Sequence, residues 1–240
     1  MISPKIKMEI FRHAQDVYPN ESCGLVTQKS RVQKYHRIDN VHDEPEKHFK
    51  MDTNQYVDVI DDESRELIAI VHSHTGDGAS ATPSAHDMSI CDEMQVLSII
   101  VSLPEGDMSI NEPKDRPLIG RPWALGSFDC WGLIMAYHKQ HGISLGDFRV
   151  DFEWWHDGGL DLYQSNYLKE GFVPIEDQKN PRPGDMVIMQ LASEVWNHAG
   201  VYMGNNQILH HTSGKLSRCD IYSGWWQNHT VMICRHKDLK

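Results

Sequence analysis

The stretch Ser127-Phe128-Asp129-Cys130-Trp131-Gly132-Leu133-Ile134 places a cysteine between a glycine- and proline-containing loop and an apolar segment. Apolar residues follow Cys130 at helical spacing as far as Tyr137, and Gly142 can end the helix. Asp129 is a suitable N-cap, so Cys130 would lie in the first helical turn. The unpaired backbone N–H groups and the helix dipole favour a thiolate there, the nucleophilic form of cysteine. A lone cysteine is more often a small buried hydrophobe, so the case for a nucleophile depends on partner residues later in the chain.

Several apolar segments after this helix predict an antiparallel sheet. The candidate strands cover residues 186–190, 197–203, 207–211 and 231–235. A turn at Gly204-Asn205-Asn206 predicts a hairpin, which would bring His198 at the start of one strand beside His210 at the end of the next. A cysteine peptidase needs a thiolate, an imidazole that moves the proton and a polar group that orients the imidazole. A helix followed by a meander, with the cysteine before the histidines, matches papain-like enzymes.

Local motifs make that match closer. Phe128-Asp129-Cys130-Trp131-Gly132-Leu133, Pro183-Gly184-Asp185, His198-Ala199-Gly200-Val201-Tyr202 and Ile208-Leu209-His210 resemble the NlpC-type family of papain-like peptidases. The resemblance covers about residues 117–236. It implies that Cys130 is the nucleophile, His198 the general base and His210 the orienting residue, with His211 as a rival for the last role. It also implies peptidoglycan stem peptides as the substrate; the alternative is a papain-like scaffold that binds and has lost its chemistry.

The first half of the chain alternates helix and strand patterns. Ile6, Ile10, Ala14 and Val17 repeat at helical spacing after Ser3-Pro4, which predicts a capped helix. Strands are expected near residues 21–26 and 31–39, and Thr53 is a candidate cap for a second helix. The apolar runs 67–71 and 96–103 predict two buried strands.

The first of these buried strands runs directly into His72-Ser73-His74, a pattern typical of metal sites. Side chains at i and i+2 leave a strand on the same face, so both imidazoles can reach one ion. Asp87 could supply a third ligand and leave one position to water. Glu21 is then the candidate for a general base, and Ser84 for a hydrogen-bond donor to an oxyanion. The alternative is a pair of solvent-facing histidines at a strand end.

The combination of motifs is more specific than the histidine pair. Glu21-Ser22-Cys23-Gly24-Leu25, His72-Ser73-His74 and Pro83-Ser84-Ala85-His86-Asp87 resemble the E…H-x-H…S-x-x-D signature of JAMM metalloproteases. The resemblance implies an α/β sandwich with a mixed sheet, zinc held by His72, His74 and Asp87, Glu21 as general base, and Ser84 as oxyanion helper. It implies hydrolysis of a peptide or isopeptide bond.

The chain departs from the JAMM pattern in two ways. Thr75 replaces the usual proline, and twelve residues separate His74 from Asp87, about two more than expected. The loop 76–80 can absorb the extra length, and Asp77 and His86 remain rival ligands.

Composition limits the remaining possibilities. Proline, glycine and charged residues are frequent between residues 104 and 117, which predicts a domain boundary near residue 112. We therefore expect an α+β protein of two domains, 1–110 and 113–240. A net charge of −11 argues against nucleic acid as a partner. No apolar run approaches the length of a membrane span, so we expect that the protein does not insert into a membrane. Met1-Ile2-Ser3-Pro4-Lys5 lacks the apolar core of a signal peptide, so we expect the protein to be made in a cytoplasm. Five scattered cysteines without a C-x-x-C pair predict reduced thiols.

The tryptophans of the second half allow two interpretations. Trp154, Trp155, Trp225 and Trp226 could line a sugar or peptide groove. Aromatic residues are more often core or interface packing, which we favour here.

A JAMM-like domain followed by an NlpC-like domain resembles the tail assembly proteins of lambda-like phages. The resemblance implies phage tail tip proteins as partners, and the host cytoplasm during assembly or the virion tail tip as locations. Our first hypothesis is a hydrolase with two peptidase sites, in which the zinc site processes a tail protein. The alternatives are a tail assembly or structural factor with vestigial catalysis in one or both domains, and a host-directed isopeptidase.

Overall fold

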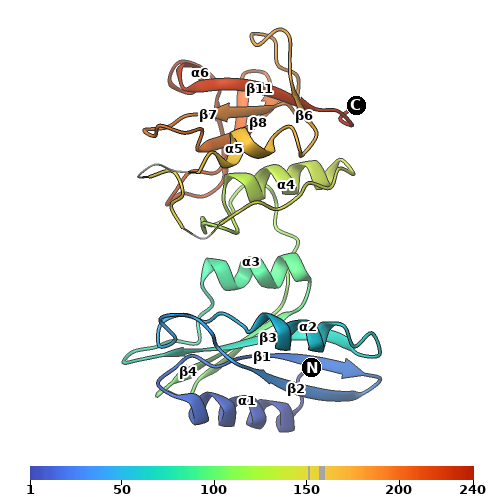
Figure 1. Ribbon diagram of the computed structural model, residues 1–240, viewed down its shortest axis with the longest axis vertical. Helices are drawn as coiled ribbons and strands as arrows, with labels where there is room; N and C mark the ends of the chain where they lie inside the picture. Colours follow the sequence, from blue (N-terminus) through green and yellow to red (C-terminus); the bar gives the residue numbers. More distant parts are fainter. Residues whose placement is uncertain (151, 157–159) are drawn as a thin grey trace. The chain divides into compact units, whose positions relative to one another are not determined.

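The structure is a computed structural model that describes residues 1–150, 152–156 and 160–240 (Figure 1). The chain divides into two units, Met1–Asp115 and Arg116–Lys240, where the sequence placed a boundary near residue 112. Among the described residues, no helix has the length and apolar character needed to cross a membrane.

The first unit is built on a five-stranded mixed sheet in the order β2-β1-β3-β4-β5. Strands β3 and β4 are parallel, and the other neighbouring pairs are antiparallel, which confirms the predicted mixed sheet. The elements are α1 (Pro4–Val17), β1 (Cys23–Lys29), β2 (Val32–Ile38), α2 (Thr53–Ile60), β3 (Glu66–Thr75), α3 (Ala85–Met94), β4 (Leu97–Leu103) and β5 (Met108–Asn111).

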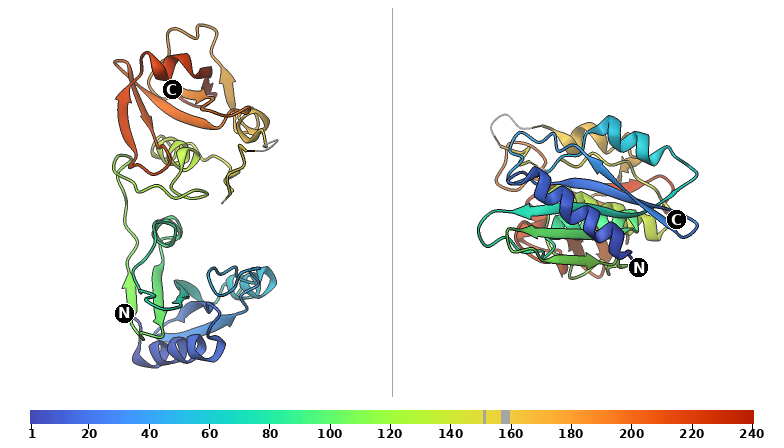
Figure 2. Two further views of the ribbon diagram at one scale, coloured as in Figure 1. Left: turned by 90° about the vertical axis from the view of Figure 1, so that its left-hand side faces the viewer. Right: turned by 90° about the horizontal axis from the view of Figure 1, so that it is seen from below.

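Helices cover both faces of this sheet (Figure 2). Helix α1 begins as the sequence predicted, because the Ser3 hydroxyl accepts a hydrogen bond from the Ile6 amide. Its apolar side packs on one face, in a cluster that includes Ala69 and Val71 of β3. Ile70, between them, packs in a second cluster with α2 and α3. Side chains alternate along a strand, so the histidines two and four positions after Ile70 lie on its face, the one toward α2 and α3.

The second unit is built on a six-stranded sheet in the order β10-β9-β8-β7-β11-β6. Every neighbouring pair is antiparallel, which confirms the predicted helix-plus-antiparallel-sheet fold. The elements are α4 (Cys130–Gln140), α5 (Leu162–Asn166), β6 (Phe172–Pro174), β7 (Met186–Met189), β8 (His198–Gly204), β9 (Gln207–His210), β10 (Arg218–Ile221), α6 (Trp225–Asn228) and β11 (Thr230–His236).

Helix α4 packs its apolar residues on one face of this sheet, including Leu133 and Ile134. Asp129 caps the helix as predicted, with its carboxylate accepting from the Gly132 amide at 2.8 Å. Gly132 is required for close packing, because a Cβ there would lie 2.2 Å from the Ser127 carbonyl oxygen. The cap and this close approach hold Cys130 at the start of the helix.

Three short strands were not expected from the sequence: β5, β6 and β10. β10 is the sequence Arg-Cys-Asp-Ile, which alternates polar and apolar residues but is too short for that alternation to identify a strand. It forms because it pairs along its whole length with β9. The predicted cap of α2 is also shifted by one residue, since the Asp52 side chain, and not Thr53, accepts from the Gln55 amide.

Candidate functional site

Cys130 lies in the wall of a cavity of about 460 Å³ in the second unit, with only 8% of its surface exposed. His198 and Tyr163 line the same cavity. Six tryptophans line it as well: Trp123, Trp131, Trp154, Trp155, Trp225 and Trp226. All four tryptophans singled out in the sequence line the cavity. Trp154 is also part of the buried core, the role that we favoured for these residues.

The Cys130 sulfur is held by donors that favour a thiolate, but burial dominates. The Tyr163 hydroxyl donates to Sγ at 3.1 Å. Burial raises the pKa of the Cys130 thiol to about 12, against the smaller effects of Tyr163 and of the Ala199 and Trp131 amides. The amide at the helix start does favour a thiolate, as expected, but desolvation of the charged sulfur outweighs it and the thiol pKa is raised overall.

The predicted hairpin brings two histidines together. His198 opens β8 and His210 closes β9, and the His198 Nε2 lies 3.4 Å from the His210 Nδ1. Burial lowers the pKa of His198 to about 3, assisted by the charges of His210 and His211. Helix α4 packs against β8, although among the described residues no hydrogen bond joins the Cys130 sulfur to the His198 ring. The resting pair is thus a neutral thiol and a neutral imidazole.

The structure distinguishes the two candidates for the orienting role. The His211 Nε2 lies 3.1 Å from the Lys215 carbonyl oxygen, and its ring meets Trp123 edge-on. It is His210 that reaches the His198 ring.

The sequence did not single out Asp220, whose carboxylate lies 3.1 Å from the His210 Nε2. The residue lies on β10, whose alternation of polar and apolar residues covers only four positions and could have been the one signal for a strand there. The pairing of β10 with β9 places this carboxylate beside the histidine.

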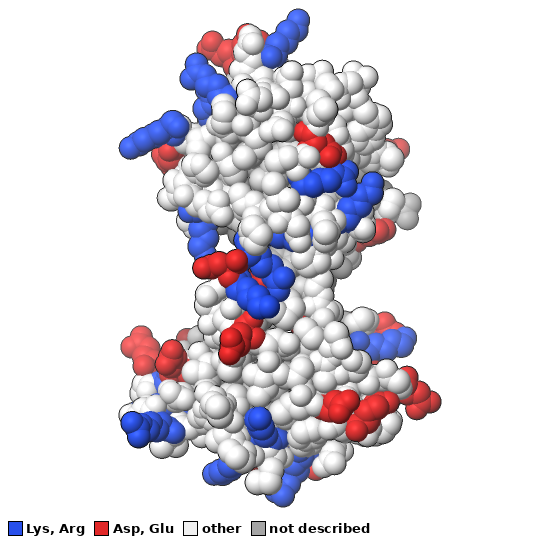
Figure 3. All heavy atoms as spheres, turned by 180° about the vertical axis from the view of Figure 1, so that it is seen from behind, with Lys and Arg blue, Asp and Glu red and all other residues white. Residues whose placement is uncertain are grey.

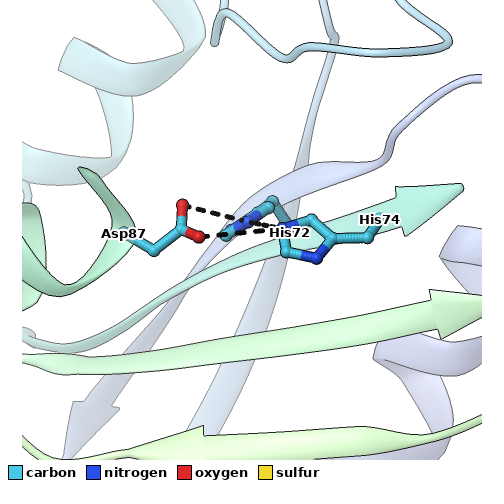
Figure 4. A group of neighbouring side chains, drawn as sticks. All are labelled: His72, His74 and Asp87. Atoms are coloured by element: carbon cyan, nitrogen blue, oxygen red, sulfur yellow. Dashed lines mark hydrogen bonds and ion pairs between the residues drawn. The ribbon is translucent and has the colours of Figure 1, made fainter. Parts of the chain in front are cut away.

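In the first unit, His72, His74 and Asp87 form a group that could hold a metal ion (Figure 4). One ligand atom from each lies within 4.8 Å of the others. The two Nε2 atoms are 3.1 Å apart, and the Asp87 oxygens lie 3.3 Å from His72 Nε2 and 3.7 Å from His74 Nε2. Two imidazoles and one carboxylate are a donor set that suits a three-ligand metal site.

The ionisation of His72 and Asp87 suits metal binding, whereas the hydrogen bond to Asp87 raises the pKa of His74, so that an ion would have to displace a proton from this ring. Burial lowers the pKa of His72 to about 4, which keeps its imidazole neutral. Burial alone would raise the pKa of Asp87, but its bonds and charge interactions with His74, His72 and Ser84 hold that pKa well below its usual range. His74 is oriented by its other ring nitrogen, because Nδ1–H donates to the Ser80 carbonyl at 2.7 Å. A neutral imidazole and an ionised carboxylate are the forms that bind metals.

Glu21 and Ser84 lie near this group. Strand β1 pairs with β3 so that Cys23 is opposite His72, and Glu21 lies just before β1 with only 6% of its surface exposed. Burial raises the pKa of Glu21 to about 7, against the opposing charge of His74. Ser84 is the N-cap of α3: its hydroxyl accepts from the Asp87 amide, and its own amide donates to the Asp87 carboxylate at 2.7 Å.

The departures from the JAMM pattern have structural consequences. The Thr75 hydroxyl lies 2.8 Å from the Pro19 carbonyl and 2.9 Å from the Glu46 carbonyl, so it ties the end of β3 to two loops. The lengthened loop places Ser80 where it orients His74. In the described part of the chain, the group that could share one ion includes neither Asp77 nor His86.

Figure 3 shows one face of the chain, on which Lys and Arg side chains are interspersed with Asp and Glu. No broad patch of a single charge appears on that face.

Comparisons with known proteins agree with this division into two units. The model of the NlpC/P60 family matches residues 120–235, and that of prokaryotic homologues of the JAB domain matches residues 3–113. The chain is 43% identical over 234 residues to the tail tip assembly protein K of Escherichia phage N15, covering 96% of this chain and 94% of that protein.

Two further relatives are more distant. The tail tip assembly protein K of Escherichia phage lambda is 29% identical over 175 residues, covering 72% of this chain and 83% of that protein. The bifunctional muramidase/DL-endopeptidase CwlT of Bacillus subtilis (strain 168) is 24% identical over 126 residues, 49% of this chain and 33% of that protein. With its two matched domains and its near full-length similarity to the phage N15 protein, the chain belongs to the family of phage tail tip assembly protein K.

Proposed function

We propose that this protein acts at the phage tail tip and that its second domain is a cysteine peptidase that cleaves peptidoglycan stem peptides. The observation that carries the proposal is one cavity containing Cys130 and His198, with His210 behind His198. A family that includes peptidoglycan peptidases and a relative named as a DL-endopeptidase support the substrate class. Lys215 and Arg218 add positive charge to the cavity wall, which suits the carboxylates of stem peptides.

The neutral resting pair defines the first step of this reaction. The Cys130 thiol gives its proton to His198 as the sulfur attacks the amide carbonyl, so the ion pair forms only with the new C–S bond. Backbone N–H groups beside Cys130 would bind the oxyanion. The imidazolium then protonates the leaving amine, and water hydrolyses the thioester with His198 again accepting a proton.

Digestion of purified Gram-negative peptidoglycan, with the products read by mass, tests this proposal. Wild type should release peptide fragments whose masses identify the bond, and Cys130→Ala should lower the rate at least about a thousandfold. Cys219→Ala is a matched control, since Cys219 lies on β10 and does not line the cavity. Digestion by Cys130→Ala at the wild-type rate would refute the nucleophile.

A protein that releases no fragment in either form would favour the second candidate, an assembly factor. In that case the cavity binds a tail protein, and the thiol chemistry is vestigial or awaits that partner.

For the first domain, we propose a zinc peptidase site that processes a tail protein. His72, His74 and Asp87 would hold the ion, a proposal supported by the donor set and by the short distances between its atoms. Bound zinc supplies a water of lowered pKa and polarises a peptide carbonyl. Glu21 can accept a proton near neutral pH, because burial raises its pKa to about 7. Ser84, beside Asp87, can donate a hydrogen bond to an oxyanion.

The zinc content of the purified protein tests this site. The protein is expressed with added zinc and purified without chelators. Wild type should carry about one zinc per chain, and His74→Ala should lose it because one of the three ligands is gone. His48→Ala is the control, since His48 is an exposed histidine of the same domain that is outside the group. Equal zinc in wild type and His74→Ala would exclude this site.

A further inference from the structure

Beyond the cysteine and its two histidines, a line of polar contacts continues to the edge of the sheet. The His198 Nε2 contacts the His210 Nδ1 at 3.4 Å, and the His210 Nε2 contacts Asp220 Oδ2 at 3.1 Å. The Asp220 carboxylate is in turn held by Arg218, whose Nε and Nη2 both lie 2.9 Å from Oδ2. Four side chains thus form one continuous path that starts at His198 in the cavity wall and ends at Arg218, which also lines the cavity.

The sheet itself builds this arrangement. Arg218 of β10 is paired directly with His210 of β9, and Asp220 is paired with Ile208. Arg218 and Asp220 are two residues apart on one strand, so their side chains leave the same face, which is also the face of His210. The position of Asp220 therefore follows from strand register and does not depend on a loop.

The path fixes which nitrogen of each ring carries a proton. An ionised carboxylate only accepts, so the His210 Nε2 must be the protonated nitrogen of that ring. Burial lowers the pKa of His210, so the ring is neutral and its Nδ1 has a free lone pair. The His198 Nε2 must then donate to it, which leaves the lone pair of His198 on Nδ1. That nitrogen is the one free to accept the proton of Cys130.

We propose that Asp220 is a positioning residue that acts through His210 to hold His198 in the tautomer able to deprotonate Cys130. The inference rests on the proposed peptidase function of the second domain. Arg218 keeps the carboxylate ionised and oriented, because its hydrogen bond is the largest influence that lowers the pKa of Asp220. Trp226 lies edge-on to His210 with ring centroids 4.3 Å apart and packs against this fully buried ring.

Replacement of Asp220 by Asn gives the sharpest test, because Asn keeps the size but offers an N–H donor. An amide that donates to the His210 Nε2 forces the proton of that ring onto Nδ1. His198 must then accept at Nε2 and carry its proton on Nδ1, the nitrogen needed by the thiol. The charged groups around His210 are Asp220, Arg218 and Lys215, and the titratable rings of His198 and His211 are also close. All variants are therefore compared at one pH at which the rings of His198 and His210 are neutral.

The first measurement is the tautomer of each ring by nitrogen-15 NMR in the full chain with Cys130→Ala, which needs no activity. We expect protonated Nε2 on both His198 and His210, with single His→Gln variants to assign the signals. In Asp220→Asn a substantial population should move to protonated Nδ1, and Asp220→Glu should restore the original state. Protonated Nδ1 on His198 in the parent chain, or an unchanged tautomer in Asp220→Asn, would overturn the proposal.

The second measurement is peptidoglycan hydrolysis with Cys130 intact. Asp220→Asn should lower kcat roughly ten- to hundredfold with little change in KM, less than the ~10⁴-fold loss when a carboxylate bonded directly to a catalytic imidazole is replaced. Asp220→Glu should recover most of the rate. Asp238→Asn is a matched control, because Asp238 lies 3.9 Å from His236 in the same domain and outside the path.

The two measurements separate the two hypotheses. Absence of hydrolysis in wild type with the expected tautomers would count against the peptidase function and leave the role of Asp220 in place. Normal hydrolysis by Asp220→Asn would overturn the role of Asp220 and leave the peptidase intact.

Discussion

At the scale of single residues, the environment of Cys130 decides its chemistry more than its position does. A cysteine in the first turn of a helix is expected to ionise easily. The side chain is 8% exposed, however, and burial raises the pKa of its thiol to about 12. The neighbouring His198 is neutral for the same reason, since burial lowers its pKa to about 3. Both groups are therefore neutral before the substrate arrives, and the same burial opposes transfer of the proton from the thiol to the imidazole until the sulfur attacks the substrate.

The raised pKa of the Cys130 thiol predicts how the rate of its alkylation depends on pH. Because the thiol pKa is raised, the thiolate fraction should rise steadily from about pH 6 to about pH 10, without a plateau at low pH. The rate of labelling by iodoacetamide, followed by mass spectrometry, measures it. Tyr163→Phe should slow labelling further, because the Tyr163 hydrogen bond acts to lower the pKa of the Cys130 thiol. A constant rapid rate between about pH 5 and about pH 8 would instead indicate a preformed thiolate–imidazolium pair.

At the scale of elements, a turn and the last strand are joined by a buried ion pair. Asp185 follows the predicted turn at Pro183-Gly184 and has no exposed surface. Its two carboxylate oxygens accept from the Nε and Nη2 of Arg235 in β11, each at 2.7 Å. The same carboxylate accepts from the Arg182 amide, so one side chain fixes the turn and its distance from β11.

This pair predicts a measurable loss of stability in the second domain. Asp185→Ala should lower the free energy of unfolding by about 2 kcal/mol, because it removes the hydrogen bonds from the Arg235 guanidinium and from the Arg182 amide. Tryptophan fluorescence during urea unfolding reports this domain alone, since all seven tryptophans lie in it.

A double-variant cycle checks the cause of that loss. Once Asp185 is replaced, Arg235→Met should cost little more, because the interaction is already gone. Fully additive costs in the double variant would show that the two side chains act independently of each other.

At the scale of the whole molecule, the chain is two units that each have their own sheet, core and candidate site. The metal group draws all its residues from the first unit, and the thiol cavity draws all its lining from the second. The Cys130→Ala and His74→Ala variants should therefore act on one site each, so that peptidoglycan digestion and zinc content can be interpreted separately.

Most of the helices and strands could be predicted from the sequence, because they depend on residues close together in the chain. Helix caps at Ser3 and Asp129, apolar runs at the buried strands and the turn before β9 all act over a few residues, and the structure keeps them. The two domain types could be recognised because their motifs combine residue type with order along the chain. The roles of Glu21, Ser84 and the other candidate residues remain predictions, to be tested by activity and metal content.

The amino-acid sequence by itself determined the two-domain α+β organisation, the helix that begins at Cys130 and the pairing of His198 with His210 across a hairpin. Only the tertiary structure decided the protonation state of Cys130, because desolvation depends on every element packed around the sulfur. It alone placed Asp220 behind His210, because the four-residue pattern of β10 is too short to identify a strand, and the register of β10 depends on its hydrogen bonds to β9. Helix caps, turns and apolar periodicity depend on neighbouring residues, so the sequence shows them directly. Burial and the pairing of a short strand depend on residues far apart in the chain.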